Sequence, residues 1–230
     1  YEPDDLSIFT TENQHAHSDA YFLESGDKIS FFFEEEAIGV DGQLRCSKSV
    51  AVNKIGHALH ALEPVFSEFA NAPRLATLAA ELGGGDPVVI QSMLIFKHPK
   101  IGGKVDCHTD HTFLWTEPPS VLGLWLALDD ATVNNGCLHA IPGGHREPVR
   151  KRFRRTATGV ETLVLDETPY AHQALVPLEV ERGTLIVLHG MLPHASPANR
   201  SADSRRAFAL HTVDRTAAWA QDNWLPQGSV

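Results

Sequence analysis

The sequence has no long apolar run, no excess of basic residues and no paired cysteine motif. No stretch approaches the roughly 18 to 20 apolar residues that a membrane-spanning helix needs, so we expect no membrane partner. Of the 230 residues, 29 are Asp or Glu and 19 are Lys or Arg, which gives a net charge of -10. This balance argues against sequence-independent nucleic-acid binding, because such binding needs Lys and Arg to neutralise phosphates.

The three cysteines, Cys46, Cys107 and Cys137, are scattered along the chain and form no CxxC motif. This usage fits reduced thiols in a cytoplasmic protein better than a disulfide framework. The first residues are acidic and lack the basic start and apolar middle of a signal peptide. The chain begins with Tyr1 and not with Met, which is consistent with residues missing from the front. We therefore expect a cytoplasmic protein, of an oligomeric state that the sequence does not indicate.

The first third of the chain predicts one strand followed by two helices. Apolar and polar residues alternate over 29–33, as in a strand. Apolar residues between 49 and 69 recur at intervals of three and four, which is typical of an amphipathic helix, and Pro64 ends or kinks it. A second helix is expected from about Pro73 to the glycines at 83–85.

After these glycines the chain reads as short strands separated by turns. Seven or so such strands without long helices between them indicate an antiparallel sandwich or barrel. Helices first and strands afterwards give an α+β protein, mainly β, with the N-terminal helices packed on one sheet. Because no repeat or linker interrupts the pattern, we expect one domain over residues 1–230. The strand candidates are DPVVIQSMLIFKH, CHTDHTFLW, VLGLWLALDD, GCLHAIPGGH, ALVPLEV, GTLIVLHG and RRAFALHTV.

The candidate strand VLGLWLALDD has two unlike faces. Its leucines at 122, 124, 126 and 128 share one face, and Trp125 lies on the other. We expect the leucine face to pack on the helices or a second sheet, and Trp125 to line a cavity. The alternative is that Trp125 is an ordinary core residue.

Six basic residues lie between Arg146 and Arg155 in an otherwise acidic chain. Such runs are usually solvated, so a surface loop is the simpler interpretation. The alternative is a lip that steers anions toward an active site.

The tripeptide His108-Thr109-Asp110 is the first candidate for chemistry. Side chains at i and i+2 of an extended strand leave the same face, so His108 and Asp110 are expected to point together. One imidazole and one carboxylate make two-thirds of the 2-His-1-carboxylate triad that suits non-haem Fe(II). A chain with 13 His produces such pairs by chance, so this interpretation needs a distant third ligand.

Three histidines further along the chain are candidates for that ligand: His189, His194 and His211. His194 follows a predicted strand, beside Pro193 and a polar loop, where its side chain can turn inward. His189 lies within the predicted strand. Periodicity alone does not choose between His189 and His194.

Arg205 is a candidate for binding a dicarboxylate co-substrate. On the predicted strand RRAFALH it shares a face with Ala207, Ala209 and His211, whereas Arg206 belongs to the other face. The two alanines leave room for a ligand, and Arg can hold a carboxylate bidentately as Lys cannot. The alternative is that both arginines are solubilising charges on an edge strand.

These segments, in this order, resemble the phytanoyl-CoA dioxygenase family of Fe(II)- and 2-oxoglutarate-dependent oxygenases. The resemblance covers nearly the whole chain and implies a double-stranded β-helix core of the jelly-roll or cupin-like kind. It also implies Fe(II), 2-oxoglutarate as co-substrate, and O2. The segments that carry it are SGDKISFFFE, SVAVNKIGHALHALEPVF, the stretch from VVIQSMLIFKH through CHTDHTFLW to IPGGHR, HGMLPHASPANRSADSRRAFALH and DNWLP.

The resemblance implies His108, Asp110 and His194 as the iron ligands, and so favours His194 over His189. The chain departs from the family pattern in having HTD where HQD is common and PGGH where PGSH is usual. Neither departure removes an implied ligand. Both could reshape the substrate pocket, so the substrate is not carried over from the family.

The resemblance also implies five residues for the co-substrate. Arg205 and Ser196 hold the distal carboxylate of 2-oxoglutarate, and Lys54, Met93 and Trp125 line its pocket. Without the resemblance, Lys54 would be interpreted as a solvated helix lysine.

We therefore expect a dioxygenase that hydroxylates an unidentified small molecule while 2-oxoglutarate is decarboxylated to succinate and CO2. One alternative is a Zn hydrolase that uses the same three ligands and a bound water. A second is a module that binds 2-oxoglutarate without turnover.

Overall fold

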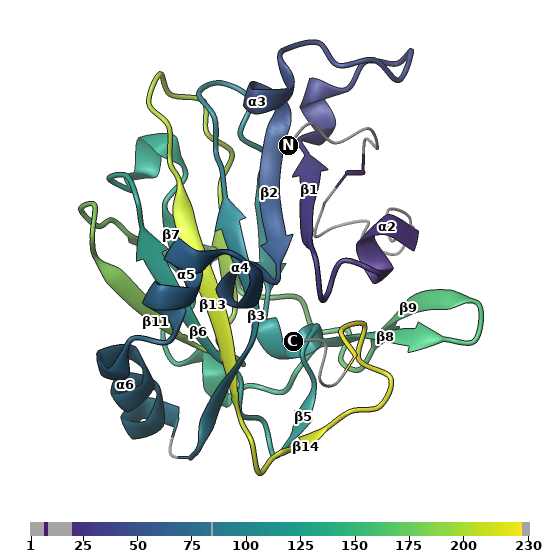
Figure 1. Ribbon diagram of the computed structural model, residues 1–230, viewed down its shortest axis with the longest axis vertical. Coiled ribbons are helices and arrows are strands. Elements are labelled where there is room, and N and C mark those ends of the chain that lie inside the picture. The colour runs from purple at the N-terminus through teal and green to yellow at the C-terminus, as the bar shows by residue number, and fades with distance from the viewer. Residues whose placement is uncertain (1–6, 9–19, 84, 227–230) are drawn as a thin grey trace.

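The computed structural model describes residues 7–8, 20–83 and 85–226. The chain is mainly β with few helices, as the sequence predicts. Two antiparallel sheets pack against each other, and short helices cover the outer face of the larger one (Figure 1). No helix in the part of the chain that the structure describes combines the length and apolarity of a membrane crossing.

The larger sheet has six strands in the order β1-β2-β3-β13-β6-β11, with antiparallel neighbours throughout. Its centre is the long pair β3 and β13, which were both expected as strands. The strands span Ile29–Phe33 (β1), Val52–His57 (β2), Pro87–Ile95 (β3), Leu122–Ala127 (β6), Leu185–His189 (β11) and Ala207–Asp214 (β13).

The smaller sheet has four strands in the order β10-β7-β12-β4, and two further two-stranded sheets are formed by β14 with β5 and by β8 with β9. The strands of the smaller sheet are β4 (Val105–His108), β7 (Leu138–Ala140), β10 (Val176–Leu178) and β12 (His194–Ser196). The short pairs are β5 (Thr116–Glu117) with β14 (Ala218–Trp219), and β8 (Lys151–Thr156) with β9 (Gly159–Val164).

The helices are short, and three of them lie together on the outer face of the larger sheet (Figure 1). The α-helices are α2 (Ala20–Leu23), α3 (Lys48–Ala51), α4 (Leu59–Leu62), α5 (Pro64–Ala70) and α6 (Pro73–Gly83). The 3-10 turns are η1 (Glu35–Ala37), η2 (Asp110–Thr112), η3 (Val133–Asn135), η4 (Gly144–Arg146) and η5 (His172–Ala174).

The outer face of the larger sheet is an apolar core under α4, α5 and α6. Leu122 and Leu124 from β6 lie there with Phe208 and Leu210 from β13, all buried. Full burial of such side chains contributes about 1.5–3 kcal/mol each. The expected division of β6 is confirmed, because its leucines pack on the helices while Trp125 points to the opposite side.

The helix expected over residues 49–69 is wrong in its first half. Residues 52–57 form β2, which pairs with β1 and β3, and helical structure is confined to α3 before it and to α4 and α5 after it. The two neighbouring strands offer backbone hydrogen bonds that outweigh a local helical period. The expected break at Pro64 is confirmed, because α4 ends at Leu62 and Pro64 begins α5. The carboxylate of Glu63 accepts two N–H groups of the first turn of α5, at 3.0 and 3.1 Å. The second helix, from Pro73, is confirmed as α6.

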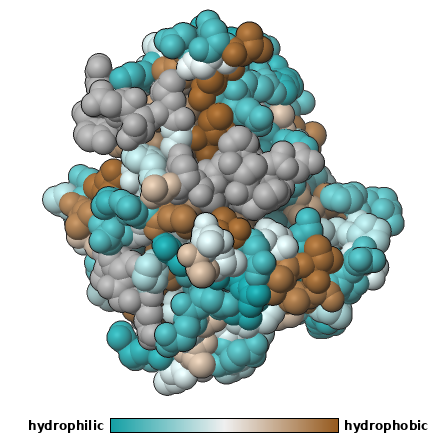
Figure 2. Space-filling model, turned by 90° about the vertical axis from the view of Figure 1, so that its right-hand side faces the viewer, coloured by the Kyte–Doolittle hydropathy of each residue, from teal (hydrophilic) through white to brown (hydrophobic). Residues whose placement is uncertain are grey.

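The basic run is not a solvated loop throughout, because four of its six basic residues lie in β8, which forms a hairpin with β9. Three of its arginines pair with nearby acids: Arg152 and Arg154 both pair with Asp222, and Arg150 lies 2.6 Å from Glu147 and 3.0 Å from Asp166. Figure 2 views the side on which α2, β1 and this hairpin lie, where apolar surface forms separate patches between hydrophilic areas.

Candidate metal and co-substrate site

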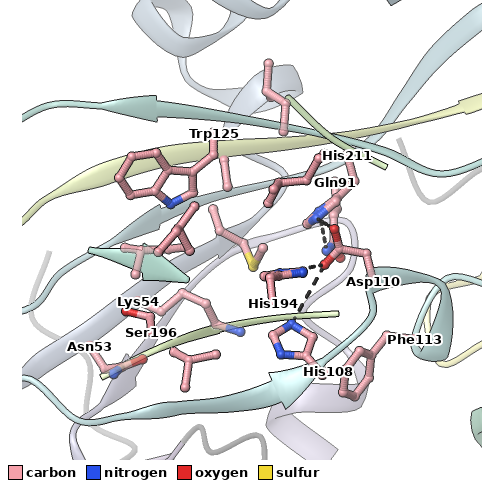
Figure 3. Close-up of a pocket in the computed structure, with 18 of the residues that line it drawn as sticks. Asn53, Lys54, Gln91, His108, Asp110, Phe113, Trp125, His194, Ser196 and His211 are labelled. Atoms are coloured by element: carbon pink, nitrogen blue, oxygen red, sulfur yellow. Dashed lines mark hydrogen bonds and ion pairs between the residues drawn. The ribbon is translucent and has the colours of Figure 1, made fainter. Parts of the chain in front are cut away.

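A cavity of about 150 Å³ lies between the two sheets and is lined by both (Figure 3). All eight residues singled out from the sequence line it. They are Lys54 from β2, Met93 from β3, His108 from β4, Asp110 from η2, Trp125 from β6, His194 and Ser196 from β12, and Arg205 just before β13.

His108, Asp110 and His194 converge at one end of this cavity. Their candidate ligand atoms all lie within 4.8 Å of one another. Asp110 Oδ1 is 3.8 Å from His108 Nε2 and 3.7 Å from His194 Nε2. Nitrogen and oxygen ligands lie about 2.1 Å from a divalent ion, so donors of one ion are no more than about 4.2 Å apart. The donor set therefore fits a divalent metal after a small adjustment.

Both histidines turn Nε2, the nitrogen that can bind a metal, toward the common site. His108 Nδ1 lies 2.7 Å from the carbonyl oxygen of Asp106, and His194 Nδ1 lies 2.9 Å from that of Leu192. Because a carbonyl oxygen only accepts, each Nδ1 carries the proton and each Nε2 directs a lone pair toward Asp110. Such contacts fix the tautomer and ring orientation of metal-binding histidines.

Electrostatics keeps the group ready for a cation. Burial, reinforced by the neighbouring His194, lowers the pKa of His108 to about 4, so its ring stays neutral. Burial alone would raise the pKa of Asp110, but His211 and His194 outweigh it and hold that pKa well below its usual value. A neutral His108 and an ionised Asp110 are in the protonation states that metal binding requires.

The expected strand geometry of the tripeptide is only half right. β4 ends at His108, and Asp110 is the first residue of η2. Thr109 is extended between them and buried, and its hydroxyl lies 2.9 Å from that of Thr112. The turn, and not a continued strand, brings the carboxylate under the two rings.

Arg205 lies at the other end of the cavity and is 1% exposed. Its Nη2 reaches Ser196 Oγ at 3.4 Å, and Ser196 Oγ in turn donates to the carbonyl oxygen of Gly136 at 2.9 Å. Its Nε and Nη1 have no hydrogen-bond partner among the described residues. Burial lowers the pKa of Arg205 to about 10 but leaves it charged. A buried guanidinium with two open donors is a ready site for a carboxylate.

Lys54 adds a second buried cation, at 2% exposure. Its ammonium lies 4.9 Å from the ring centroid of Phe32, and burial holds its pKa well below the usual lysine value. Met93 and Trp125 flank the space beside it, because both pair in register with Ala209 on β13. The residues predicted for the co-substrate therefore share one cavity, although their roles stay predictions.

The phytanoyl-CoA dioxygenase (PhyH) family model matches residues 9–207 of this chain. The chain belongs to the phytanoyl-CoA dioxygenase family.

Curated members of this family are similar over most of their length. The phytanoyl-CoA dioxygenase of Arabidopsis thaliana is 46% identical over 225 residues, which cover 97% of this chain and 79% of the relative. Phytanoyl-CoA dioxygenase domain-containing protein 1 of Mus musculus is 45% identical over 210 residues, covering 89% of this chain and 72% of the relative.

Solved structures share the fold. AviO1 from Streptomyces viridochromogenes Tue57 is 25% identical, with a TM-score of 0.60 over 78% of this chain and 73% of that chain. EctD from S. alaskensis in its apoform is 20% identical, with a TM-score of 0.63 over 97% of this chain and 86% of that chain. At the latter identity the likeness concerns the fold alone.

Two kinds of cavity residue take positions that the sequence analysis did not predict. His211, considered as a third ligand, faces the other oxygen of Asp110 at 3.4 Å and is bonded to Gln91. The other kind is aromatic: the segment DNWLP was part of the resemblance, but Trp224 within it carried no function. It lines the cavity with Phe22, and their rings stack 4.5 Å apart. A contact between chain ends leaves no local signal in the sequence.

Proposed function

We propose that this protein is an Fe(II)- and 2-oxoglutarate-dependent dioxygenase that hydroxylates a small molecule and releases succinate and CO2. The observation that carries this proposal is the pairing, in one cavity, of a two-histidine, one-carboxylate donor set with a buried guanidinium that has open donors. A metal site alone would suit many reactions. The Arg205 guanidinium, at the end of the cavity away from the metal ligands, adds a requirement for an anionic co-substrate.

The fold agrees with this activity. We interpret the two facing antiparallel sheets as a double-stranded β-helix, and we propose that it belongs to a single domain over residues 1–230. The metal ligands come from the smaller sheet and the turn after β4, and the co-substrate residues come mainly from the larger sheet. The cavity between them brings both sets within reach of one ligand.

His108, Asp110 and His194 would hold Fe(II). When bound, Fe(II) with 2-oxoglutarate and O2 supplies the oxidising chemistry. The protein contributes orientation: the two Nδ1–H groups hold the imidazoles in place, and Asp110 stays ionised between them. The surrounding buried side chains limit the access of water to the site.

Arg205 and Ser196 would hold the distal carboxylate of 2-oxoglutarate. The open Nε and Nη1 of Arg205 supply two donors, and Lys54 supplies positive charge near the same ligand. Met93 and Trp125 would flank its carbon chain. A diacid would relieve the cost of burying the Arg205 guanidinium, because it would give the open Nε and Nη1 a partner.

The substrate would enter at the metal end of the cavity. Lys54 and His57 lie on the same strand at different levels: in the sheet register Lys54 is level with Ala207, near the guanidinium, while His57 is level with Leu210. The other residues at the His57 end are mostly apolar, and they are Phe22, Phe113, Leu114 and Trp224. Burial and the nearby charge of Lys54 keep the pKa of His57 well below its usual value, so its ring is neutral. This end of the cavity therefore favours an uncharged, apolar part of a substrate.

The hairpin of β8 and β9 holds together the aromatic wall formed by Phe22 and Trp224. Arg155 donates from Nε to the carbonyl oxygen of Trp224 and from Nη2 to that of Leu23, both at 2.6 Å. It therefore joins α2, which carries Phe22, to the C-terminal segment. The hairpin would act as a clamp on the aromatic wall, and not as an anion-steering lip.

We extend the proposal to location and partners. Three free cysteines and the acidic composition fit a cytoplasmic protein whose partner is a small molecule, without nucleic-acid or membrane partners. Of the two alternative functions, a Zn hydrolase gives no role to Arg205 or Lys54. A module that only binds 2-oxoglutarate gives no role to the metal ligands beyond anchoring.

Turnover under air tests the proposal against both alternatives. Purified protein with Fe(II) should convert 2-oxoglutarate to succinate, slowly alone and faster with a substrate from a small-molecule screen. Zn(II) should not replace Fe(II). Absence of succinate with Fe(II), after metal analysis has confirmed loading, would favour the binding module; hydrolysis of a screened ester or amide with Zn(II) would favour the hydrolase.

A further inference from the structure

The candidate ligand Asp110 has a second carboxylate oxygen that faces the larger sheet. Oδ1 lies toward the two histidines, whereas Oδ2 is fully buried and lies 3.4 Å from His211 Nε2. This separation is longer than a typical N–H···O hydrogen bond, so we describe it as a polar contact. Figure 3 shows His211 and Gln91 beside Asp110, on the opposite side from His108.

Gln91 decides which nitrogen of His211 carries the proton. Its Nε2 lies 3.0 Å from His211 Nδ1, and an amide nitrogen can only donate, so Nδ1 accepts. The proton is then on Nε2 and points at Asp110. Reversing the amide would move the proton to Nδ1 and leave a lone pair of Nε2 against the carboxylate, which electrostatic repulsion disfavours. The carboxylate and the amide therefore select the same tautomer.

The sheet also makes room for this contact. Gly123 on β6 pairs in register with His211 on β13. A Cβ at Gly123 would lie 3.0 Å from Asp110 Oδ2 and 3.7 Å from His211 Cδ2. Contacts of 3.0 Å are tighter than side chains normally make, so any larger residue would push on the carboxylate. The absence of a side chain here keeps the carboxylate against the sheet.

From these contacts we infer that Gln91 and His211 are positioning residues for the metal site, holding Asp110 from the larger sheet over Gly123. The series of contacts from Gln91 through His211 to Asp110 fixes the carboxylate, so that only Oδ1 is presented to the metal. Outer-shell partners of this kind orient metal ligands, and their loss typically costs about 10–100-fold in metal affinity. The inference rests on the metal site of the proposed function.

Binding of Co(II) to the whole chain, followed by its visible d–d absorption, tests this without any need for turnover. His211→Leu should weaken Co(II) binding about 10–100-fold and change the absorption. His211→Gln, whose amide nitrogen can take the place of Nε2, should recover most of the affinity. Gln91→Leu and Gly123→Ala should give smaller losses, since the first frees the tautomer and the second displaces Oδ2.

The matched control is His189→Leu, which removes an exposed histidine from the neighbouring strand β11 and should leave Co(II) binding unchanged. Thermal unfolding of each metal-free variant establishes that it is folded. Wild-type affinity in both His211→Leu and Gln91→Leu would overturn the inference. Equal losses in His211→Leu and His211→Gln would also overturn it, because volume and not the N–H group would then be responsible. Failure of the wild type itself to bind Co(II) in a His108-dependent way would instead overturn the metal site and the proposed function.

Discussion

The two faces of β6 and β13 are made from alternate residues of the same strands, yet they differ in every physical respect. The outer face carries Leu122, Leu124, Phe208 and Leu210 and packs on the helices. The inner face carries small residues, an indole and an imidazole, and it opens into the cavity. Both faces bury apolar residues, but the outer face is covered by the helices, whereas the inner face leaves a cavity between the sheets.

The inner side also holds charges that burial makes costly. Arg205 is 1% exposed and has two open donors, and Lys54 is 2% exposed with its pKa lowered by burial. Buried charges without full compensation destabilise a fold. The outer face therefore contributes to stability alone, whereas the inner side combines a buried apolar cluster with the buried guanidinium of Arg205, which lowers stability when no ligand is bound. Substitutions on the two faces should therefore separate stability from ligand binding.

The largest effect is expected at the metal ligands. His194→Ala removes one of three donors from a preformed group, so Mn(II) bound per chain should fall from about one to nearly zero at micromolar concentrations, while the melting temperature of the metal-free protein changes little. Equilibrium dialysis with metal analysis measures this. His189→Ala is the control, and retained stoichiometric metal in His194→Ala would contradict the assignment.

Arg205→Met should separate binding from stability most clearly. It removes the proposed partner of the distal carboxylate, so the dissociation constant for 2-oxoglutarate should rise about 100-fold or more. Because the guanidinium is buried with open donors, the ligand-free variant should be as stable as wild type or more stable. Calorimetry and thermal unfolding measure the two quantities.

The adjacent arginine provides the control for that experiment. Arg206 is exposed and pairs with Asp129 at 2.7 Å, so Arg206→Met should leave 2-oxoglutarate binding unchanged and cost less than about 1 kcal/mol. If Arg206→Met weakened 2-oxoglutarate binding as much as Arg205→Met, the division between the two faces of β13 would be wrong.

Neighbouring residues of β13 should show the opposite behaviour. Leu210→Ala opens a cavity under the helices and should lower the free energy of unfolding by about 2–5 kcal/mol, with metal affinity retained. Ala209→Val adds volume beside Met93 and Trp125 and should weaken 2-oxoglutarate binding with a smaller loss of stability. Urea unfolding and ligand titration together test this pair; a reversed pattern would contradict the comparison.

A smaller effect is expected for the hairpin clamp. Arg155→Met removes two charge-assisted hydrogen bonds, each worth about 1.5–3 kcal/mol. Hydrogen exchange should rise in α2 and around Trp224, and binding of metal and 2-oxoglutarate should stay unchanged. Lys151→Met, on an exposed position of the same strand, is the control. Unchanged exchange in both segments would exclude the clamp.

The smallest effect is a pH dependence from Lys97, which also lines the cavity. Burial, with the charge of Arg205, lowers the pKa of Lys97 from 10.5 to about 7. Between these two values the unfolded chain binds more protons, so the contribution of Lys97 to stability should rise with pH, by at most about 1.4 kcal/mol per unit. Below pH 7 this contribution of Lys97 to stability should not change with pH. The difference in unfolding free energy between wild type and Lys97→Met, followed from pH 6 to 9, measures this; a difference that falls over pH 7 to 9 would contradict it.

Local pattern was sufficient where one period dominated. Alternation of side chains predicted β1 and β6, and the span from a proline to a run of glycines predicted α6. The two alanines that share a face with Arg205 predicted that its side chain points inward. Pattern failed at β2, because its apolar residues also fit a helical period and only pairing with β1 and β3 decides the structure. It also failed at Asp110, whose position depends on a turn.

The rest of the site depends on contacts between distant residues. Periodicity left His189 and His194 equal, and it was the resemblance that favoured His194, which the structure brings beside His108. His211 reaches Asp110 only through the register of β13 with β6, and Phe22 meets Trp224 only when the two ends of the chain come together. Such contacts are set by tertiary packing, which a single sequence does not display.

The most direct test is an anaerobic titration of the protein with Fe(II) and 2-oxoglutarate, followed by visible absorption. Wild type should develop a metal-to-ligand charge-transfer band that saturates at one 2-oxoglutarate per chain. His108→Ala should show no band, and Arg205→Met should require far more 2-oxoglutarate to reach the same intensity. No band in the wild type, or an undiminished band in His108→Ala, would contradict the placement of metal and co-substrate in this cavity.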